Sequence, residues 1–154
     1  MKDKYINPLS ILMVDDDDDD CLMTKEALKE VRINSDIAFV KDCEELIDYL
    51  QHQGKYSEPD SSPRPNLILL DLNMPKKRGC EVLKEIKSNP ELQSIPIIVL
   101  TTSKSEEDVL RAYDLGANSF ITKPASFEML VDVMKTLTKY WFDIVKLPQE
   151  IKRR

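Results

Sequence analysis

The sequence predicts an α/β fold: a five-stranded parallel sheet with helices on both faces, in a single domain. The first observation is that short apolar runs, typical of strands, alternate with segments whose apolar residues recur at helical spacing. The second is the run Leu67-Ile-Leu-Leu70, because four consecutive apolar residues are typical of a central strand buried on both faces. The third is the length of 154 residues, which provides for one hydrophobic core but not two. Strands joined by crossover helices form a parallel sheet with right-handed connections.

The N-terminal part of the chain contains two predicted strands, residues 9–14 and 36–40. Between them, a helix is expected to start within the aspartate run and to end near residues 32–34, because carboxylates favour the positive end of a helix dipole. Asp42 is expected to cap a second helix over residues 43–53. The inner sides of these two helices would carry Leu22, Leu28 and Val31, and Leu46, Ile47 and Leu50.

Residues 54–66 are expected to form a surface loop. The segment contains Gly54, three prolines and three serines, and it offers little to a hydrophobic core. It is also longer than a compact α/β unit needs. Two interpretations stay open: an insertion that the fold tolerates, and a loop that contacts a partner.

The middle of the chain continues the alternation. The buried run 67–70 ends on Asp71, and Pro75 prevents it from continuing as regular sheet. A helix is then expected to open at Gly79 and to close at residues 89–90. Its inner side would carry Val82, Leu83 and Ile86.

The C-terminal part supplies the last two strands, residues 96–101 and 118–122. Between them, the stretch 105–108 has the pattern of a capping box, and Gly116 stands where a helix would end. Ser126 would cap a final helix that runs to about Lys146. The helix between the two strands would turn Val109, Ala112 and Tyr113 inward.

The net charge of −6 has one local source, the run Asp15–Asp20. The 28 acidic residues less these six balance the 22 basic ones. No segment has the surplus of bases that a nucleic-acid-binding protein would show, so no nucleic-acid partner is expected.

The sequence also indicates a compartment. No apolar stretch approaches the length of a membrane span, and the N-terminus has no signal-peptide pattern, so a membrane is not an expected partner. Cys21, Cys43 and Cys80 are scattered without metal-ligand spacing. They are interpreted as packing residues in a reducing cytoplasm.

Several polar residues stand at strand ends that a parallel sheet brings to one edge. Asp15 and Asp16 follow the first strand, Asp71 the third, Thr101 ends the fourth and Lys123 follows the fifth. Three carboxylates would repel one another, and a hard divalent cation with oxygen ligands, Mg²⁺, removes that conflict. A lysine and a hydroxyl beside them describe a place for a phosphoryl group, which a carboxylate could accept as an aspartyl phosphate.

These motifs together resemble the receiver domain of two-component response regulators, over about residues 8–140. The resemblance is carried by Val14-Asp15-Asp16, Leu70-Asp71-Leu-Asn-Met-Pro75, Val99-Leu-Thr101 and Lys123-Pro124. It implies a flavodoxin-like (βα)5 receiver over residues 8–146, between tails at residues 1–7 and 147–154. The loop before the third strand and the ending Tyr140–Pro148 are similar to the small stand-alone regulators of bacterial and cyanobacterial phytochromes.

The resemblance also implies roles for the site. Asp71 would be the phosphoacceptor, and Lys123 would pair with the phosphoryl oxygens. Mg²⁺ would be bound directly by Asp16 and mainly through water by Asp15, with Asp71 and the backbone carbonyl of Asn73 completing the metal site. The peptide bond from Lys123 to Pro124 would be cis, as in the family.

A switch follows from the same resemblance. Thr101 would hydrogen-bond the phosphoryl group and move toward it, and Phe120 stands where the family has an aromatic that turns inward in response. This would change the surface formed by the fourth helix, the fifth strand and the fifth helix of the fold. The alternative is that Phe120 is a core aromatic that never moves.

Two features depart from the family pattern. Arg78 stands just before Gly79, where many members have an acid. That position is not a ligand in the family, so the departure puts the family's partner choice and phosphoryl lifetime in question for this chain more than its chemistry. The aspartate run continues through Asp17–Asp20, beyond the two acids that the site needs. These extra acids are interpreted as a solvated helix start, or alternatively as charges that lower phosphoryl affinity or strengthen the attraction of Mg²⁺.

The last helix has more apolar residues than one buried face requires. The expected stripe toward the sheet is Phe127, Leu130, Met134, Leu137, Trp141 and Ile144, with Val131, Phe142 and Val145 left over. The surplus suggests a homodimer or partner surface. The alternative is a helix wedged deeply in its own monomer.

The leading functional hypothesis is a signalling switch rather than an enzyme. A sensor histidine kinase, of phytochrome type by the resemblance, would donate the phosphoryl group, and the chain would catalyse only its own phosphorylation and dephosphorylation. With no output domain in the sequence, a downstream protein or a phosphotransfer protein would read the result. His52 is the only histidine and is not expected to carry the phosphoryl group.

The rival hypothesis is a Mg²⁺-dependent phosphohydrolase of the haloacid-dehalogenase type. Such enzymes also use an aspartyl nucleophile, a Thr or Ser and then a Lys in chain order, and Asp15–Asp17 could imitate their first motif. They need an acidic pair after the lysine, where this chain has the isolated Asp132 and Asp143. The role of Asp71 would also go unexplained.

Overall fold

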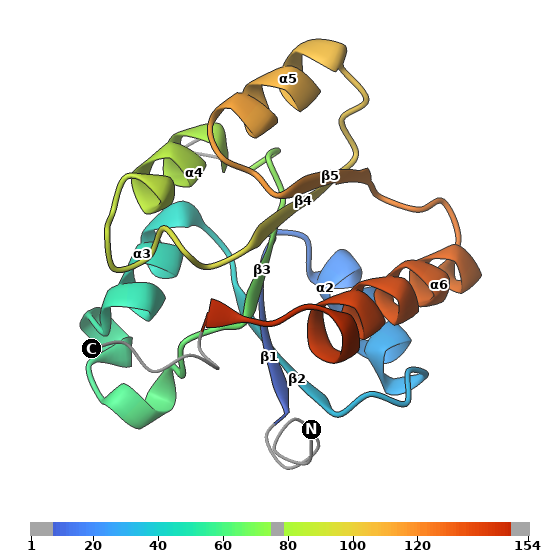
Figure 1. Cartoon of the computed structure of the whole chain (residues 1–154), viewed down its shortest axis with the longest axis horizontal. Coiled ribbons are helices and arrows are strands. Elements are labelled where there is room, and N and C mark those ends of the chain that lie inside the picture. Colours follow the sequence, from blue (N-terminus) through green and yellow to red (C-terminus); the bar gives the residue numbers. More distant parts are fainter. Residues whose placement is uncertain (1–7, 75–78, 149–154) are drawn as a thin grey trace.

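A computed structural model of the chain describes residues 8–74 and 79–148, and its centre is a parallel sheet of five strands. The strands lie in the order β2-β1-β3-β4-β5, as Figure 1 shows. Both neighbours of β1 run parallel to it, and so do both neighbours of β4. The bounds are β1 Leu9–Val14, β2 Ser35–Val40, β3 Leu67–Leu70, β4 Ile97–Thr101 and β5 Ser119–Thr122. The predicted fold class is confirmed.

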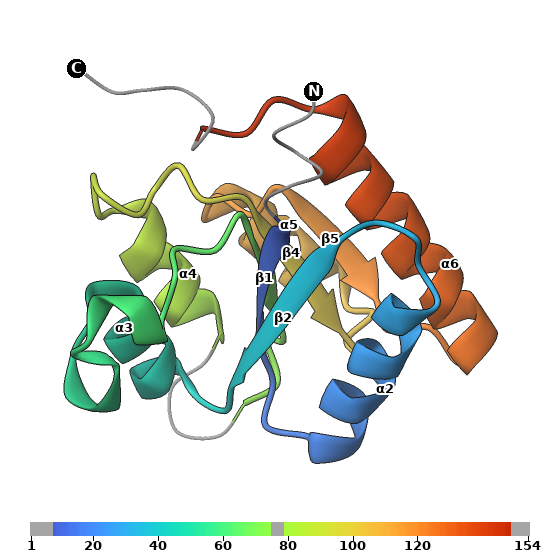
Figure 2. The ribbon, with the colours of Figure 1, turned by 90° about the horizontal axis from the view of Figure 1, so that it is seen from below.

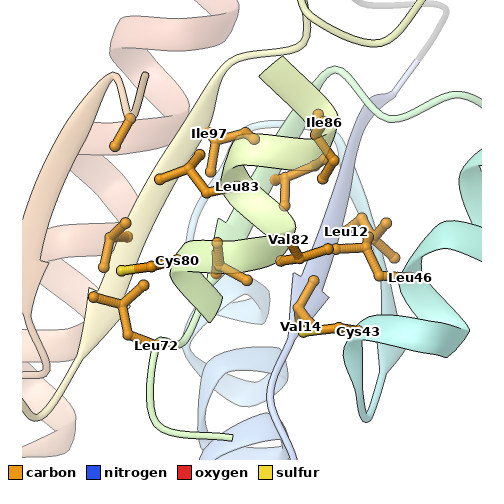
Figure 3. Packing of buried hydrophobic residues seen from close by; sticks show 14 of the residues in the cluster. Leu12, Val14, Cys43, Leu46, Leu72, Cys80, Val82, Leu83, Ile86 and Ile97 are labelled. Atoms are coloured by element: carbon orange, nitrogen blue, oxygen red, sulfur yellow. The ribbon is translucent and has the colours of Figure 1, made fainter. Parts of the chain in front are cut away.

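Helices cover the two faces of the sheet in two groups (Figure 2). Helices α2 (Asp18–Lys29) and α6 (Phe127–Thr138) pack together on one face, while α3 (Cys43–Gln51), α4 (Gly79–Lys87) and α5 (Glu106–Asp114) lie on the other. Every residue of β3 is buried, because helices cover this strand from both sides. Figure 3 shows part of the core on the α3, α4 and α5 face, where Leu12, Leu46, Val82, Leu83, Ile86 and Ile97 meet.

The predicted helix caps hold in the structure. Asp42, Ser105 and Ser126 each accept a hydrogen bond from a backbone amide in the first turn of α3, α5 and α6. Gly116 follows α5 with a φ of +110°, a conformation that favours glycine. Asp17, which the sequence did not single out as a cap, accepts hydrogen bonds from the amides of Asp19 and Asp20 and starts α2.

The predicted core-facing residues of two helices, α2 and α5, need correction. Helix α2 ends at Lys29 rather than near residue 32, and Leu22 is 58% exposed while Cys21 and Thr24 are buried. Tyr113 of α5 is exposed as well. The helical period leaves the inner face ambiguous by one position where apolar residues stand next to each other, and packing against the sheet decides between them.

The last helix differs from the expected one. Its α-helical part ends at Thr138, and a π-helix (η3, Lys139–Ile144) follows. In this π-turn the amide of Val145 donates to the carbonyl of Tyr140, and Phe142 is the residue of the turn that is buried. The buried residues of α6 are Leu130, Met134 and Thr138, whereas Phe127 and Ile144 are exposed and Leu137 and Trp141 are only partly buried.

The segment 54–66 is better anchored than expected. It forms two short 3-10 turns, η1 (Gly54–Tyr56) and η2 (Pro59–Ser61). The Tyr56 hydroxyl donates to Glu45 of α3 over 2.6 Å, and the buried Ser62 hydroxyl lies 2.8 Å from Nδ1 of His52. Most of the segment is exposed, as expected for a surface loop, and these two contacts tie it to α3 and to the residue that follows α3.

No helix in the described part of the chain is long and apolar enough to cross a membrane. All three cysteines are buried, as the packing interpretation expects.

Candidate functional site

The candidate site lies at the edge of the sheet where the strands end. Backbone hydrogen bonds carry the strand register past the last paired residues and fix these positions. The amide of Asp15 donates to Val40, that of Asp71 to Val14, and that of Lys123 to Thr101 over 2.7 Å. Side chains that are 108 positions apart in the chain, those of Asp15 and Lys123, consequently meet.

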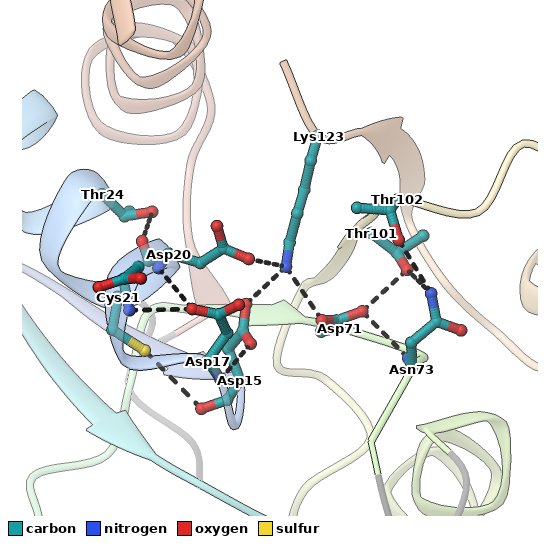
Figure 4. Close-up of polar contacts among 11 residues, drawn as sticks. Asp15, Asp17, Asp20, Cys21, Thr24, Asp71, Asn73, Thr101, Thr102 and Lys123 are labelled. Carbon is teal, nitrogen blue, oxygen red and sulfur yellow. Dashed lines mark hydrogen bonds and ion pairs between the residues drawn. The ribbon is translucent and has the colours of Figure 1, made fainter. Parts of the chain in front are cut away.

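The Lys123 ammonium group lies at the centre of the site (Figure 4). Its Nζ atom is 2.8 Å from Asp15 Oδ2, 2.6 Å from Asp20 Oδ2 and 3.0 Å from Asp71 Oδ2. A lysine ammonium has three donors, and here each has a carboxylate acceptor. The group is mostly buried, so these ion pairs are screened less by solvent than surface pairs would be.

The other oxygen of Asp71 is bound from the opposite side. The Thr101 hydroxyl donates to Asp71 Oδ1 over 2.8 Å, and the backbone amide of Asn73 donates to the same atom over 3.0 Å. The Asn73 side chain in turn donates to the hydroxyls of Thr101 and Thr102. Asp71 is thereby held with one oxygen toward the lysine and the other toward the hydroxyls, as Figure 4 shows.

Three carboxylates of the site fit a divalent cation. Asp15, Asp16 and Asp71 each present a ligand oxygen, and these atoms lie within 4.8 Å of one another. An all-oxygen set with one exposed member, Asp16, suits a hard cation that keeps part of its water shell. The donor chemistry therefore matches a divalent metal site.

In the site, burial and ion pairing act in opposite directions on the charged groups. Burial raises the pKa of the Asp15 carboxyl above its ordinary value, although hydrogen bonds from Lys123 and from the Asp17 amide act to lower it. For Lys123, burial acts to lower the pKa, but hydrogen bonds to Asp15, Asp20 and Asp71 outweigh it and raise the pKa. The lysine is the cation that makes this carboxylate cluster tolerable in the fold.

A neighbouring thiol is excluded from the chemistry. Cys21 lies behind the site, and its sulfur is 3.7 Å from the carbonyl oxygen of Asp15. Burial, followed by the charge of Asp15, raises the pKa of the Cys21 thiol to about 11. The thiol therefore stays protonated and is neither a nucleophile nor a metal ligand near neutral pH.

The five residues predicted at the strand ends, Asp15, Asp16, Asp71, Thr101 and Lys123, are brought together. Phe120 lies on β5, two residues before the strand ends at Thr122, and is half-buried against the core under α3, α4 and α5. The described part of the chain contains no cis peptide bond, so the expectation of a cis bond before Pro124 is wrong for this structure. Cis and trans forms before proline differ by only about 0.5–1 kcal/mol, so the sequence alone does not decide between them. Pro75 and Arg78 lie outside the described residues.

One charged partner in the site was not predicted. Asp20 stands in the first turn of α2 and reaches Lys123, while its neighbours Asp17, Asp18 and Asp19 are exposed. The interpretation of the extra acids as a solvated helix start is therefore wrong for Asp20. The available signal was that Asp20 falls in the first turn of a helix that begins beside the strand-end acids, but a run of identical residues does not reveal which of them faces the site.

Comparison with known proteins agrees with this geometry. Residues 11–135 match the family model described as response regulator receiver domain. Response regulator Rcp1 of Synechocystis is 43% identical over 148 residues, which cover 96% of this chain and 99% of Rcp1. The crystal structure of the phosphorylated cyanobacterial phytochrome response regulator RcpA is similar with a TM-score of 0.84 at 40% identity, covering 92% of this chain and 99% of RcpA. The Mn²⁺-bound form of Rcp1 is similar with a TM-score of 0.81 at 43% identity, with the same coverage.

Proposed function

The chain belongs to the response regulator receiver family, and on this basis we propose that Asp71 accepts a phosphoryl group from a sensor histidine kinase in a reaction that requires Mg²⁺. The observation that carries the proposal is the position of the Asp71 carboxylate. One of its oxygens faces the Lys123 ammonium and the other the Thr101 hydroxyl, and two further carboxylates lie within reach of a shared cation. This is the environment that a phosphoryl group on Asp71 would need.

In the proposed transfer one bond to phosphorus forms and one breaks. An Asp71 carboxylate oxygen attacks phosphorus of the kinase phosphohistidine, and an O–P bond forms as the P–N bond breaks. The electron pair of the broken bond stays with the histidine nitrogen. The product is an acyl phosphate on Asp71, which water later hydrolyses. The chain thus catalyses its own modification and its reversal, and no other reaction.

Lys123 and Thr101 have distinct tasks in this transfer. The Lys123 ammonium offsets negative charge on the phosphoryl oxygens, since it already lies 3.0 Å from Asp71 Oδ2. The Thr101 hydroxyl now donates to Asp71 Oδ1 and would redirect its hydrogen bond to a phosphoryl oxygen. Asp15, Asp16, Asp71 and the carbonyl of Asn73 would hold Mg²⁺, which when bound offsets the charge of the carboxylates and of the transferring group.

A change in the position of the Phe120 side chain would connect phosphorylation to the protein surface. This residue follows Ser119 on the edge strand β5, and its backbone pairs with Val99 of β4, two residues before Thr101. A movement of Thr101 toward the phosphoryl group would make room for Phe120 to turn inward, changing the surface of α5, β5 and α6. A downstream protein or a phosphotransfer protein would read this surface. The exposed side chains of α6 and η3 also support a homodimer through this end of the chain.

The similarity to Rcp1 and RcpA supports a narrower proposal. RcpA is described as a phytochrome response regulator, so the kinase of the present chain would be of phytochrome type and both partners cytoplasmic. The receiver would span residues 8–146, with residues 54–66 as a loop insertion between flanking tails at 1–7 and 147–154. The family match favours this function over the haloacid-dehalogenase-type alternative.

The test is the intact mass of the protein after incubation with acetyl phosphate and Mg²⁺. One added phosphoryl group is expected, dependent on Mg²⁺ and absent in Asp71→Asn. Phosphorylation that persists in Asp71→Asn but disappears when Asp15 is changed would instead favour the phosphohydrolase. No added mass under any condition would contradict the proposal.

A further inference from the structure

The acidic run at the start of α2 contains one residue, Asp20, with a contact that the proposed chemistry does not use. We infer that Asp20 is a positioning residue that competes with the incoming phosphoryl group for Lys123, and that it thereby weakens phosphoryl binding at Asp71. This inference rests on the proposed function and adds a regulatory element to the same site.

The contact between Asp20 and Lys123 is the shortest that the ammonium makes. Nζ lies 2.6 Å from Asp20 Oδ2, compared with 2.8 Å and 3.0 Å for the oxygens of Asp15 and Asp71. The Asp20 backbone is fixed as well: its amide donates to the side chain of Asp17, and its carbonyl accepts from the Thr24 hydroxyl. From this fixed backbone position the Asp20 carboxylate reaches Lys123, as Figure 4 shows.

The surroundings of this ion pair favour a strong interaction. Beside it lies a small cavity of about 40 Å³ that Asp20 and Lys123 line together with apolar side chains, including those of Met13, Leu100 and Leu130. Apolar surroundings on one side reduce solvent screening of the pair. The pair is nevertheless open to exchange, because Asp20 is about one-third exposed.

The three carboxylates that contact Lys123 differ in whether a bound cation could take the place of the lysine as their counter-charge. Asp15 and Asp71 belong to the carboxylate cluster that fits a divalent cation, and Asp20 does not. The lysine has no donor left for a phosphoryl oxygen while all three pairs persist. The cation could compensate Asp15 and Asp71, but Asp20 would still hold one donor and add a negative charge near the phosphoryl oxygens.

The competition can be measured as binding of trifluoroberyllate, a stable mimic of the phosphoryl group, followed by fluorine NMR at saturating Mg²⁺. Asp20→Asn keeps the shape of the side chain and removes its charge. The expected result is about a two- to fivefold lower half-saturating concentration, the range for a partly exposed charge pair. In phosphorylation by acetyl phosphate, the half-saturating donor concentration is expected to fall by a similar factor.

Two variants separate position from charge. Asp19→Asn removes the same charge one residue away, from an exposed side chain, and is expected to change binding much less. Asp20→Glu retains a carboxylate that can reach Lys123 and is expected to stay close to the unmodified protein. Titration of Mg²⁺ into each variant separates an effect on phosphoryl binding from an effect on the metal.

The outcomes are distinct. Weaker binding in Asp20→Asn would mean that Asp20 supports Lys123 rather than competing for it, and would overturn the inference. A change equal to that of Asp19→Asn would also overturn it, in favour of a general charge effect. In both cases the unmodified protein would still bind trifluoroberyllate. Failure of the unmodified protein to bind the mimic or to gain a phosphoryl group would overturn the proposed function and the inference together.

Discussion

The backbone amide of Phe120 donates a hydrogen bond to the phenolic oxygen of Tyr113 over 3.1 Å. This contact joins the edge strand β5 to the last turn of α5, on the surface that the proposed switch would change. It also gives a partner to an amide of an edge strand. Tyr113, predicted from the sequence as an inward residue of α5, therefore acts through its hydroxyl.

Removing that hydroxyl should loosen β5 without affecting phosphorylation. For Tyr113→Phe we expect a loss of about 0.5–1 kcal/mol in the free energy of unfolding, because one hydrogen bond to a solvent-accessible amide is exchanged for water. The sharper measurement is amide hydrogen exchange at Phe120, which should become faster. Tyr140→Phe, on the distant η3 segment, serves as control, and equal exchange in both variants would contradict the assigned contact.

The raised pKa of Asp15 predicts a specific pH dependence. Unfolded Asp15 loses its proton near its ordinary pKa of 3.8, whereas folded Asp15 loses it at higher pH. As pH rises through this window the unfolded state is favoured, and the cost persists at neutral pH. Asp15→Asn lacks this cost, so its stability relative to the unmodified protein should improve from about pH 3 to about pH 7. Urea unfolding without divalent metal would check this, and a constant difference would refute it.

Gly79 is required by close packing against the backbone of Asp71 and Leu72. A Cβ atom at this position would lie 2.8 Å from the Cα atom of Leu72 and 2.9 Å from the carbonyl oxygen of Asp71. Both are backbone atoms, so neither can rotate away. We expect Gly79→Ala to lower the free energy of unfolding by about 1–3 kcal/mol and to slow phosphorylation.

Gly54→Ala is the matched comparison for that variant. Its added Cβ would meet only the end of the Asp48 side chain, 3.2 Å away, at a φ of +56° that other residues occasionally adopt. A cost of about 1 kcal/mol and unchanged phosphorylation are expected. If phosphorylation slowed equally in both variants, the special role of the contact between Gly79 and Asp71 would be lost.

The π-turn at the end of α6 predicts which aromatic residue the core needs. Phe142 is buried against the sheet, whereas Ile144 is 63% exposed. Phe142→Ala should cost about 3–5 kcal/mol, the usual range for a buried aromatic. Ile144→Ala should stay within about 0.5 kcal/mol. Urea unfolding of both variants decides between this arrangement and the α-helical register, in which Ile144 would be the more damaging position.

The fold and the meeting of the main site residues could be predicted because both follow from short-range patterns. Consecutive apolar residues at positions 67–70 indicate a strand buried on both faces, and the alternation with helices makes the sheet parallel. In a parallel sheet the carboxyl ends of all strands lie at the same edge. Asp71, Thr101 and Lys123 consequently meet, whatever the details of packing.

Other features depend on tertiary contacts that no local pattern contains. Helical spacing did not show whether Cys21 or Leu22 faces the core, nor that a π-turn would bury Phe142. Likewise, six consecutive aspartates carry no mark of which one reaches Lys123. These choices depend on side-chain packing and on the direction in which α2 leaves the sheet.

The sequence by itself determined the parallel α/β fold, the helix caps at Asp42, Ser105 and Ser126, and the set of strand-end residues. Each of these depends on a period or a spacing along the chain. Only the tertiary structure decided that Asp20 shares Lys123 with Asp15 and Asp71. The physical reason is that an ion pair between the start of α2 and the end of β5 depends on where two separate elements come to lie, and their positions are set by packing on the sheet.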